Sequence, residues 1–398
     1  MNLSGRALTA PASPIRRMIP FAEQAMKMGK KIYYLNIGQP DIPTPRVYFE
    51  YVERYKPSVV AYTHSAGLLE LREAFSRYYE KFSVKVLPDE IIVTNGGSEA
   101  VLFAMAVVAD PGDEILVLEP FYANYAGFAA QLGIKLVPVR TYPEDGYSVP
   151  DKKKFLEKIS SKTKAIIFSN PCNPTGAVYN ESQLRTIIDV ALEKDLFIIS
   201  DEVYREFTFD GCKAISALSF EPILDRVIMV DSISKRYSAC GARIGAFVSK
   251  NKSIYSAALK FAQARLCPPM TSQYGAIGLL SLDDEYVESI KNEYQARRDV
   301  VYEELKKIDG AVFQKPKGAF YISARLPVDN VEEFVKFMLL EFDVGGKTTM
   351  VSPLDGFYAT PSAGLDEMRI AYVLNCDDLR DAVRILALGV EEYKRKVR

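Results

Sequence analysis

Short apolar runs recur through the middle of the chain, and polar or amphipathic stretches separate them. The runs are Ile91–Thr94, Ile115–Leu118, Ala165–Phe168, Leu196–Ser200, Val227–Val230 and Gly245–Ser249. Continuous apolar runs of this kind are typical of strands that are buried on both faces. Helical patterns such as Ala100–Val108 and Glu181–Lys194 lie between most of them. This alternation predicts an α/β fold, with a mainly parallel sheet between helices.

The pattern changes after Gly275. Residues Glu285–Lys307 repeat apolar positions at helical spacing and predict one long amphipathic helix. The elements expected after it are strand Phe320–Ser323, helix Val331–Leu340, strand Met368–Val373 and helix Asp377–Tyr393. We therefore expect a large domain over residues 46–290 and a smaller α+β domain over 291–398. Residues 1–45, rich in Pro, Arg and Met near their start, predict an arm that packs with the small domain and is not a core element.

Length and charge limit the classes of function. A chain of 398 residues is too long for one ordinary core, which agrees with two domains. Lys and Arg number 50 and Asp and Glu 51, so the net charge of −1 gives no reason to expect nucleic acid or an anionic membrane as a partner. The first ten residues lack the apolar core of a signal peptide, and no run of about 18 apolar residues follows.

Cysteine and histidine usage limits the chemistry. The five cysteines are odd in number and scattered, which favours reduced thiols and a cytoplasmic protein. His64 is the single histidine, so a multi-histidine metal site is excluded and we expect no metal. A Ser-His-Asp hydrolase would depend on His64 alone, which we interpret as a structural or loop residue.

Polar residues follow several of the predicted strands, where the sites of α/β proteins gather. Lys235 comes shortly after Val227–Val230, and a deprotonated lysine can form a Schiff base with an aldehyde. Ser232, Ser234 and Arg243 could together hold a phosphate, which arginine binds with two parallel hydrogen bonds. Taken alone, Lys235 could equally be a surface lysine in a polar loop.

Three further segments add candidates. Asp201 ends the run Leu196–Ser200, where a buried carboxylate needs a partner such as a protonated pyridine nitrogen; alone, it could be a helix N-cap. Tyr204 and Asn173 could reach a ring oxygen. The pair Gly96-Gly97 precedes Ser98 and opens a helix, whose N-terminus attracts anions.

In combination, these segments resemble the fold-type-I pyridoxal phosphate enzymes, specifically the class I/II aminotransferase family, from about Tyr34 to the C-terminus. The motifs that carry the resemblance are N-I-G-Q-P-D (36–41), Y-T-H-S-A-G (62–67), N-G-G-S-E-A (95–100), P-F-Y (120–122), N-P-C-N-P-T-G (170–176), S-D-E-V-Y (200–204), S-I-S-K-R-Y-S-A-C-G-A-R-I-G (232–245) and M-R-I-A-Y (368–372). Eight motifs in family order are hard to obtain by chance.

The resemblance implies pyridoxal 5′-phosphate as cofactor and a role for each matching residue. Lys235 is similar to the Schiff-base lysine that also carries protons, and Asp201 to the partner of the pyridine nitrogen. Arg369, helped by the Gly38 backbone, resembles the clamp for the substrate α-carboxylate. The remaining matches are Asn173 and Tyr204 at the ring hydroxyl, Tyr122 stacked on the ring, Gly97, Ser98, Ser232, Ser234 and Arg243 around the phosphate, and Tyr62 reaching the phosphate of a neighbouring subunit. Tyr62 thus implies a homodimer.

The implied activity is transamination between an amino acid and a 2-oxo acid, within amino-acid metabolism. Aspartate, or a broad set of amino acids, with 2-oxoglutarate is the simplest expectation. The alternative is a β-lyase or an aminocyclopropane-carboxylate-synthase-like enzyme on the same scaffold. A binding module behind a DNA-binding domain is a third class, disfavoured by the short stretch before Tyr34 and the neutral charge. Arg265 departs from the family position that reads a side-chain carboxylate, which leaves specificity open.

Overall fold

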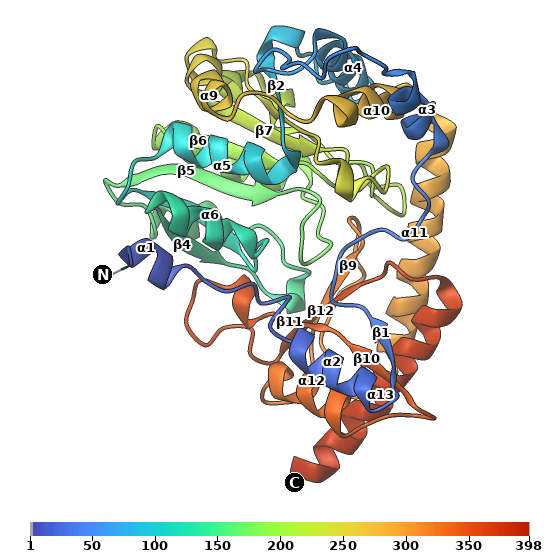
Figure 1. Ribbon diagram of the computed structural model, residues 1–398. Helices are drawn as coiled ribbons and strands as arrows, with labels where there is room; N and C mark the ends of the chain where they lie inside the picture. Colours follow the sequence, from blue (N-terminus) through green and yellow to red (C-terminus); the bar gives the residue numbers. More distant parts are fainter. Residues whose placement is uncertain (1–2, 398) are drawn as a thin grey trace.

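A computed structural model describes residues 3–397, and its central element is a seven-stranded sheet (Figure 1). The spatial order is β2 (Ile91–Thr94), β8 (Gly245–Val248), β7 (Val227–Ser232), β6 (Phe197–Asp201), β5 (Thr163–Ser169), β3 (Glu114–Glu119) and β4 (Lys135–Arg140). Only β8 runs antiparallel to its neighbours. The predicted α/β class and mainly parallel sheet are confirmed; β4 is an additional strand.

Alternate residues of these strands enter two separate cores. Ile199 packs on the face covered by α5 (Gly96–Val108), α6 (Asn124–Leu132) and α9 (Lys252–Arg265). Its neighbour Ile198 packs on the face covered by α4 (Leu69–Glu80), α8 (Glu181–Glu193) and α10 (Met270–Leu280). Because both faces of the sheet are covered, the sequences of the strands are continuous apolar runs. Burial of each Ile or Val side chain contributes about 1.5–3 kcal/mol to the free energy of folding. Helices α3 (Arg46–Arg54) and α7 (Lys152–Leu156) complete this part.

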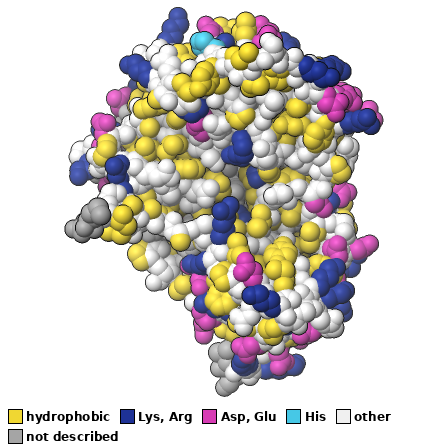
Figure 2. Space-filling model, viewed as in Figure 1, with side chains coloured by type: hydrophobic (Ala, Val, Ile, Leu, Met, Phe, Trp, Pro, Cys, Tyr) yellow, Lys and Arg dark blue, Asp and Glu magenta, His cyan; other side chains and the backbone are white. Residues whose placement is uncertain are grey.

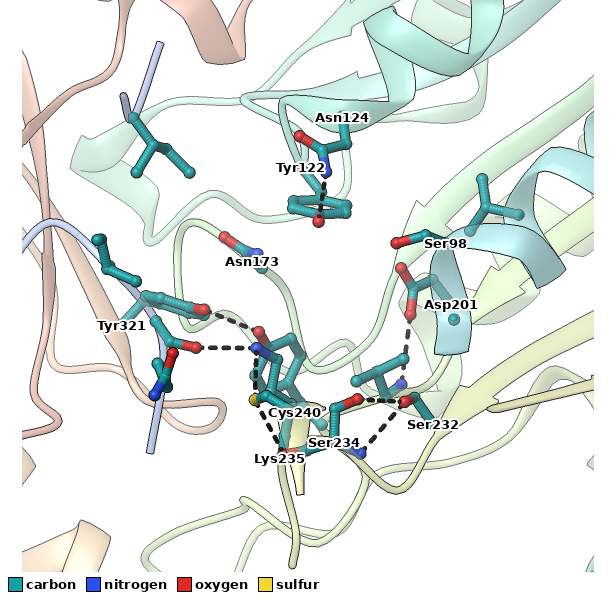
Figure 3. A pocket seen from close by; sticks show the side chains of 18 of the residues that line it. Ser98, Tyr122, Asn124, Asn173, Asp201, Ser232, Ser234, Lys235, Cys240 and Tyr321 are labelled. Atoms are coloured by element: carbon teal, nitrogen blue, oxygen red, sulfur yellow. Dashed lines mark hydrogen bonds between the residues drawn. The ribbon is translucent and has the colours of Figure 1, made fainter. Parts of the chain in front are cut away.

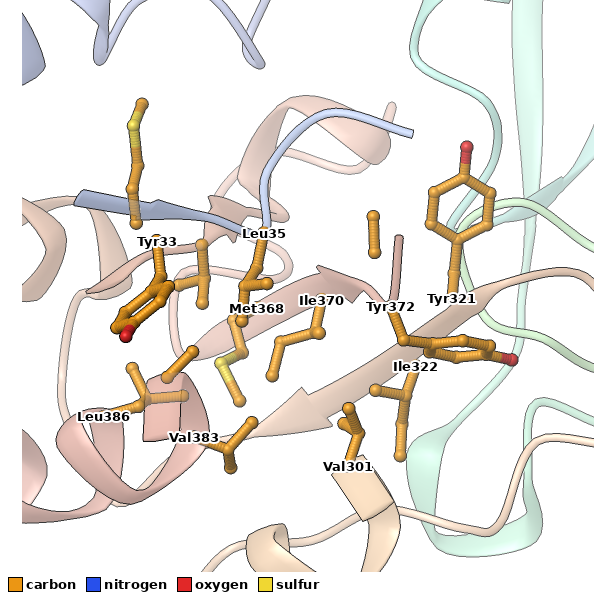
Figure 4. Close-up of a cluster of buried hydrophobic side chains, with 14 of the residues drawn as sticks. Tyr33, Leu35, Val301, Tyr321, Ile322, Met368, Ile370, Tyr372, Val383 and Leu386 are labelled. Atoms are coloured by element: carbon orange, nitrogen blue, oxygen red, sulfur yellow. The ribbon is translucent and has the colours of Figure 1, made fainter. Parts of the chain in front are cut away.

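A second, smaller sheet lies below the first in Figure 1, in the order β11 (Ser352–Pro353), β12 (Glu367–Ala371) and β9 (Tyr321–Arg325). Its core side chains pack with residues of α12 (Val331–Leu340) and α13 (Cys376–Val397) (Figure 4). The long helix α11 (Asp284–Leu305) forms as its periodicity predicts and runs alongside both sheets (Figure 1). The domain boundary expected at residue 290 falls inside this helix and stays a prediction.

The N-terminal segment differs from the expected arm. Helix α1 (Gly5–Thr9) lies against α6, but α2 (Ile19–Lys27) packs on α12. Strand β1 (Lys31–Tyr34) pairs in parallel with β10 (Lys347–Met350). Met18, Ala25 and Leu35 are fully buried in the core of the small sheet, so the expectation that this segment lies outside the core was wrong. The pairing partner of β1 lies near the opposite end of the chain, and local pattern cannot reveal it.

The topology gathers polar residues at one edge of the large sheet. Parallel strands place their carboxyl ends together, and Asp201 ends β6 while Ser232 ends β7. Helix α5 begins directly after β2. Across the described part of the chain, no helix is long and apolar enough to span a membrane.

Candidate active site

A cavity of about 590 Å³ lies between the carboxyl edge of the large sheet and the small sheet. Figure 2 shows a hollow near the middle of this face, with basic side chains above and below it. The structure brings almost every predicted site residue to this cavity: Gly38, Gly97, Ser98, Tyr122, Asn173, Asp201, Tyr204, Ser232, Ser234, Lys235, Arg243 and Arg369. Tyr62 is the exception, because it lies outside the cavity of its own chain with 78% of its surface exposed.

Lys235 projects into the cavity from the turn that follows β7 (Figure 3). Its Nζ donates a hydrogen bond to the carbonyl oxygen of Gly38 at 2.8 Å and lies 3.8 Å from Cys240 Sγ. Within residues 3–397, this amine forms no ion pair with a carboxylate. The two neutral contacts leave the amine free to turn toward another group in the cavity.

Asp201 is a buried carboxylate that forms no ion pair within residues 3–397. Its side chain accepts a hydrogen bond from the Tyr125 hydroxyl at 2.6 Å and another from the Val203 backbone N–H at 3.3 Å. Burial raises the pKa of Asp201 to about 6, and these two hydrogen bonds only partly oppose the shift. Among the described residues no Lys or Arg pairs with it, so its charge suits a cationic N–H group supplied by a ligand.

Hydroxyls, backbone N–H groups and one guanidinium converge beside Asp201. The Ser232 and Ser234 hydroxyl oxygens lie 2.8 Å apart, and Ser98 lies in the first turn of α5. The N-cap Asn95 makes no side-chain cap, so the first N–H groups of α5 stay available to an anion. Arg243 donates to backbone carbonyls of Cys240 and Asn95, at 3.0 and 3.2 Å, which holds it at the cavity.

The opposite wall carries a buried cation, Arg369. Arg369 lies on β12, the central strand of the small sheet, and is 1% exposed. It donates to Asn173 Oδ1 at 2.9 Å and to the Asn36 carbonyl at 2.7 Å, while its Nε has no partner in the described chain. Burial lowers the pKa of Arg369. A buried guanidinium with only neutral partners is well suited to bind an anionic group.

Asn173, Tyr204 and Tyr122 lie between these walls and could contact a flat ring. Asn173 Oδ1 accepts a hydrogen bond from Arg369 Nη1, which leaves the amide N–H groups to donate elsewhere. The hydroxyls of Tyr204 and Tyr321 lie 2.8 Å apart. Tyr122 accepts a hydrogen bond from Asn124 Nδ2 at 2.8 Å, and burial raises its pKa to about 12, so its ring is neutral at physiological pH (Figure 3).

Sequence reasoning missed Tyr125 and Tyr321. Tyr125 is in the first turn of α6, and its spacing of three from Tyr122 was the available signal. Tyr321 lies in a strand that the pattern did predict, but nothing in the pattern shows that its ring covers the Arg369 guanidinium, with a distance of 4.4 Å to the ring centroid. Arg265 does not line the cavity. Its Nε pairs with Glu99 at 3.2 Å, and its Nη2 donates a hydrogen bond to the Val93 carbonyl.

These features together fit pyridoxal phosphate. Pyridoxal phosphate has an aldehyde, a protonatable ring nitrogen, a ring hydroxyl and a phosphate dianion. The cavity contains the amine of Lys235, the buried carboxylate of Asp201, and a group of hydrogen-bond donors beside the start of α5, namely the serine hydroxyls and backbone N–H groups. A side chain at position 97 would project into the space beside these donors, since a Cβ there would lie 3.6 Å from Ser232 Cβ. The fold and the cavity therefore define an enzyme of the pyridoxal phosphate class.

Comparisons with known proteins identify the family. Residues 30–386 match the family described as "Aminotransferase class I and II". An aspartate aminotransferase of Pyrococcus abyssi is 34% identical, over 99% of this chain and 100% of that protein. A (5-formylfuran-3-yl)methyl phosphate transaminase of Methanocaldococcus jannaschii is 33% identical, over 96% and 97% of the two chains. The structure of an alanine aminotransferase from Pyrococcus furiosus superposes with a TM-score of 0.89 at 32% identity, over 98% and 100% of the chains.

The chain belongs to the class I and II aminotransferases, which are pyridoxal-phosphate-dependent enzymes of fold type I. Transamination and the fold expected from the sequence are thereby confirmed. The three relatives carry different substrate names, so membership of the family leaves the substrate open.

Proposed function

We propose that the protein transfers an amino group between an amino acid and a 2-oxo acid, with aspartate and 2-oxoglutarate as the simplest pair. The observation that carries this proposal is the presence, in one cavity, of the free amine of Lys235, the buried carboxylate of Asp201 and the buried guanidinium of Arg369. When bound, pyridoxal phosphate supplies an aldehyde that captures amines and a ring that withdraws electrons. The protein supplies binding, orientation and proton transfer.

In this proposal each wall of the cavity has one task. Ser98, Ser232, Ser234, Arg243 and the Gly97 backbone hold the phosphate, while Asp201 keeps the ring nitrogen protonated. The Tyr125 hydrogen bond fixes the orientation of the Asp201 carboxylate. Asn173 and Tyr204 donate to the ring hydroxyl, and Tyr122 stacks on the ring. Asp201 and Tyr204 act through these contacts with the cofactor.

Lys235 is the proton carrier in the proposed reaction. With the cofactor bound, its Nζ would leave the Gly38 carbonyl, take the proton from the substrate Cα and hold it on the amine. Arg369 holds the α-carboxylate, and the Gly38 backbone lies beside it, so the Cα–H bond is presented to the amine.

Substitution of Arg369 by lysine tests the carboxylate clamp. The change keeps the charge but loses the planar fork that binds a carboxylate with two hydrogen bonds. We expect kcat/KM to fall for every amino acid tested, by a factor equivalent to about 2–4 kcal/mol of transition-state stabilisation, because the paired charged hydrogen bonds to the buried carboxylate are lost. Simple amines without a carboxylate should be nearly unaffected. A loss confined to acidic substrates would instead assign Arg369 to the side chain of the substrate.

We also propose a homodimer in which Tyr62 reaches the phosphate of the neighbouring site. Tyr62 lies among exposed apolar side chains, with Val59 and Val60 each at least 70% exposed, and a partner subunit would cover such a surface. In this dimer, Tyr62 of one subunit completes the phosphate-binding site of the other subunit.

Mixed dimers test this arrangement. A chain with Tyr62→Phe combined with a chain with Lys235→Ala should contain one intact site, built from Lys235 of the first chain and Tyr62 of the second. We expect activity and cofactor affinity to recover in that mixed dimer and isolated monomers to be inactive. No recovery of cofactor affinity would show that Tyr62 acts within its own subunit or has no role at the site.

A panel of single half-reactions tests the proposed function itself. Each amino acid is mixed with the loaded enzyme while the cofactor absorbance and the 2-oxo acid formed are followed. Transamination gives one 2-oxo acid per amino group retained on the enzyme. Release of pyruvate and free ammonia would instead show a β-lyase.

A further inference from the structure

The charges that line the cavity do not balance. Four basic side chains face one carboxylate: Arg16, Lys235, Arg243 and Arg369 against Asp201. In the proposed function, Lys235 engages the cofactor aldehyde, Arg243 the phosphate and Arg369 the α-carboxylate. Asp201 is matched by the ring nitrogen. Arg16 is then the one cation, among the described residues of the wall, that has no anionic counterpart.

The backbone that carries Arg16 is fixed on both sides. Pro14 is buried so closely against Gly356 that a Cβ at position 356 would lie 2.4 Å from the Pro14 ring. Arg17 forms ion pairs with Asp355 and, at 2.8 Å, with Glu332. Met18 is fully buried. Arg16 is therefore presented by an anchored segment.

The two neighbouring arginines of this segment have opposite surroundings. Arg17 is neutralised by two carboxylates and does not line the cavity. Arg16 lines the cavity and its side chain is exposed. Within residues 3–397, this side chain forms neither an ion pair nor a hydrogen bond. A guanidinium that is positioned and unpaired in a binding cavity is suited to a ligand anion.

We propose that Arg16 binds a second anionic group at the far end of the substrate, the side-chain carboxylate of a dicarboxylic amino acid or 2-oxo acid. The proposal rests on the proposed function, since it needs Arg369 to take the α-carboxylate. Arg16 from the N-terminal segment and Arg369 from β12 then hold the substrate at both ends. Arg265 is not available for this task within its own chain, because Glu99 and backbone carbonyls occupy its guanidinium.

Substrate pairs that differ by one anion test the proposal. Arg16→Met removes the charge and keeps a side chain of similar length. We expect kcat/KM for aspartate to fall about 10-fold to 100-fold, and kcat/KM for alanine to change less than about twofold. Arg16→Lys should restore part of the activity with aspartate.

O-phosphoserine tests whether the anion is a phosphate. If the wild type has a higher kcat/KM for O-phosphoserine than for aspartate, and Arg16→Met lowers kcat/KM more for O-phosphoserine, the anion bound by Arg16 is a phosphate and the carboxylate assignment is overturned.

Arg46→Met is the matched control for the loss of one positive charge. Arg46 is 92% exposed, pairs only with Glu50 and lies outside the cavity. We expect this variant to retain the wild-type ratio of kcat/KM for aspartate to that for alanine. A similar change in this ratio in Arg46→Met and Arg16→Met would show a general effect of net charge and overturn the proposal.

Binding without turnover gives an independent measurement. Calorimetric titration of the loaded enzyme with succinate and with propionate compares a dicarboxylate with a monocarboxylate of similar size. Arg16→Met should weaken succinate about 10-fold and leave propionate within about twofold. An equal loss of affinity for succinate and propionate, or an equal loss of kcat/KM for aspartate and alanine, would overturn the role of Arg16. If no amino acid changes the cofactor absorbance of the wild type, the proposed function itself fails, whichever carboxylates bind.

Discussion

Replacement of Lys235 by alanine is expected to lower turnover by at least about 10²–10⁴-fold, the contribution usual for a positioned acid–base group. The loss should be this large because one amine both anchors the cofactor and carries the proton. The variant should still bind pyridoxal phosphate, since the donors around Ser232, Ser234 and Arg243 remain. The cofactor should then be removable by dialysis, without a link that borohydride can reduce.

The control for Lys235 is a lysine of the same chain outside the cavity. Lys252 is exposed at the start of α9, and Lys252→Ala should keep both turnover and borohydride labelling. Mass spectrometry of the reduced wild-type enzyme should find the modified peptide at Lys235. Labelling at another lysine would contradict the assignment.

Asp201→Asn should have the second largest effect. The amide cannot keep the ring nitrogen protonated, so the electron-withdrawing power of the ring is lost. Breaking a buried charge pair by removing one partner costs about 3–5 kcal/mol, and we expect kcat to fall by about 10²–10⁴-fold on this ground. Asp189→Asn, on the exposed side of α8, is the matched control and should be indistinguishable from the wild type.

The same substitution should stabilise the protein when the cofactor has been removed. The pKa of Asp201 is raised from 3.8 to about 6, so the folded protein binds a proton more tightly than the unfolded chain. This contribution to the free energy of unfolding is present below pH 4 and is lost as the pH rises through 6. The cofactor-free Asp201→Asn variant should therefore have a higher Tm than the wild type at pH 8, and the difference should shrink toward pH 4. Near-wild-type turnover, or a lower Tm at pH 8, would show that Asp201 is misassigned.

Two buried aspartates show what the sequence cannot decide. Asp201 and Asp231 both stand at the carboxyl ends of predicted strands. Asp231 accepts two hydrogen bonds from Arg236, at 2.9 and 2.6 Å, and although burial opposes ionisation, this arginine holds the pKa of Asp231 below its usual value. In the part of the chain that the structure describes, Asp201 has no such partner, and burial raises its pKa. The difference arises from which side chains converge in space, so Asp231 is a structural ion pair and Asp201 is available to a ligand.

The sequence by itself determined every strand of the large sheet except β4, together with helices α5 and α8, since local periodicity records which faces are buried. It also determined the order of the motifs and hence the residues that gather at the carboxyl edge of that sheet. Tertiary structure alone decided three features. These are the pairing of β1 with β10, the hydrogen bond from Tyr125 to Asp201, and the opposite surroundings of Arg16 and Arg17. Each depends on contacts between segments far apart in the chain, and the local sequence pattern around a residue does not indicate which distant segment it will contact.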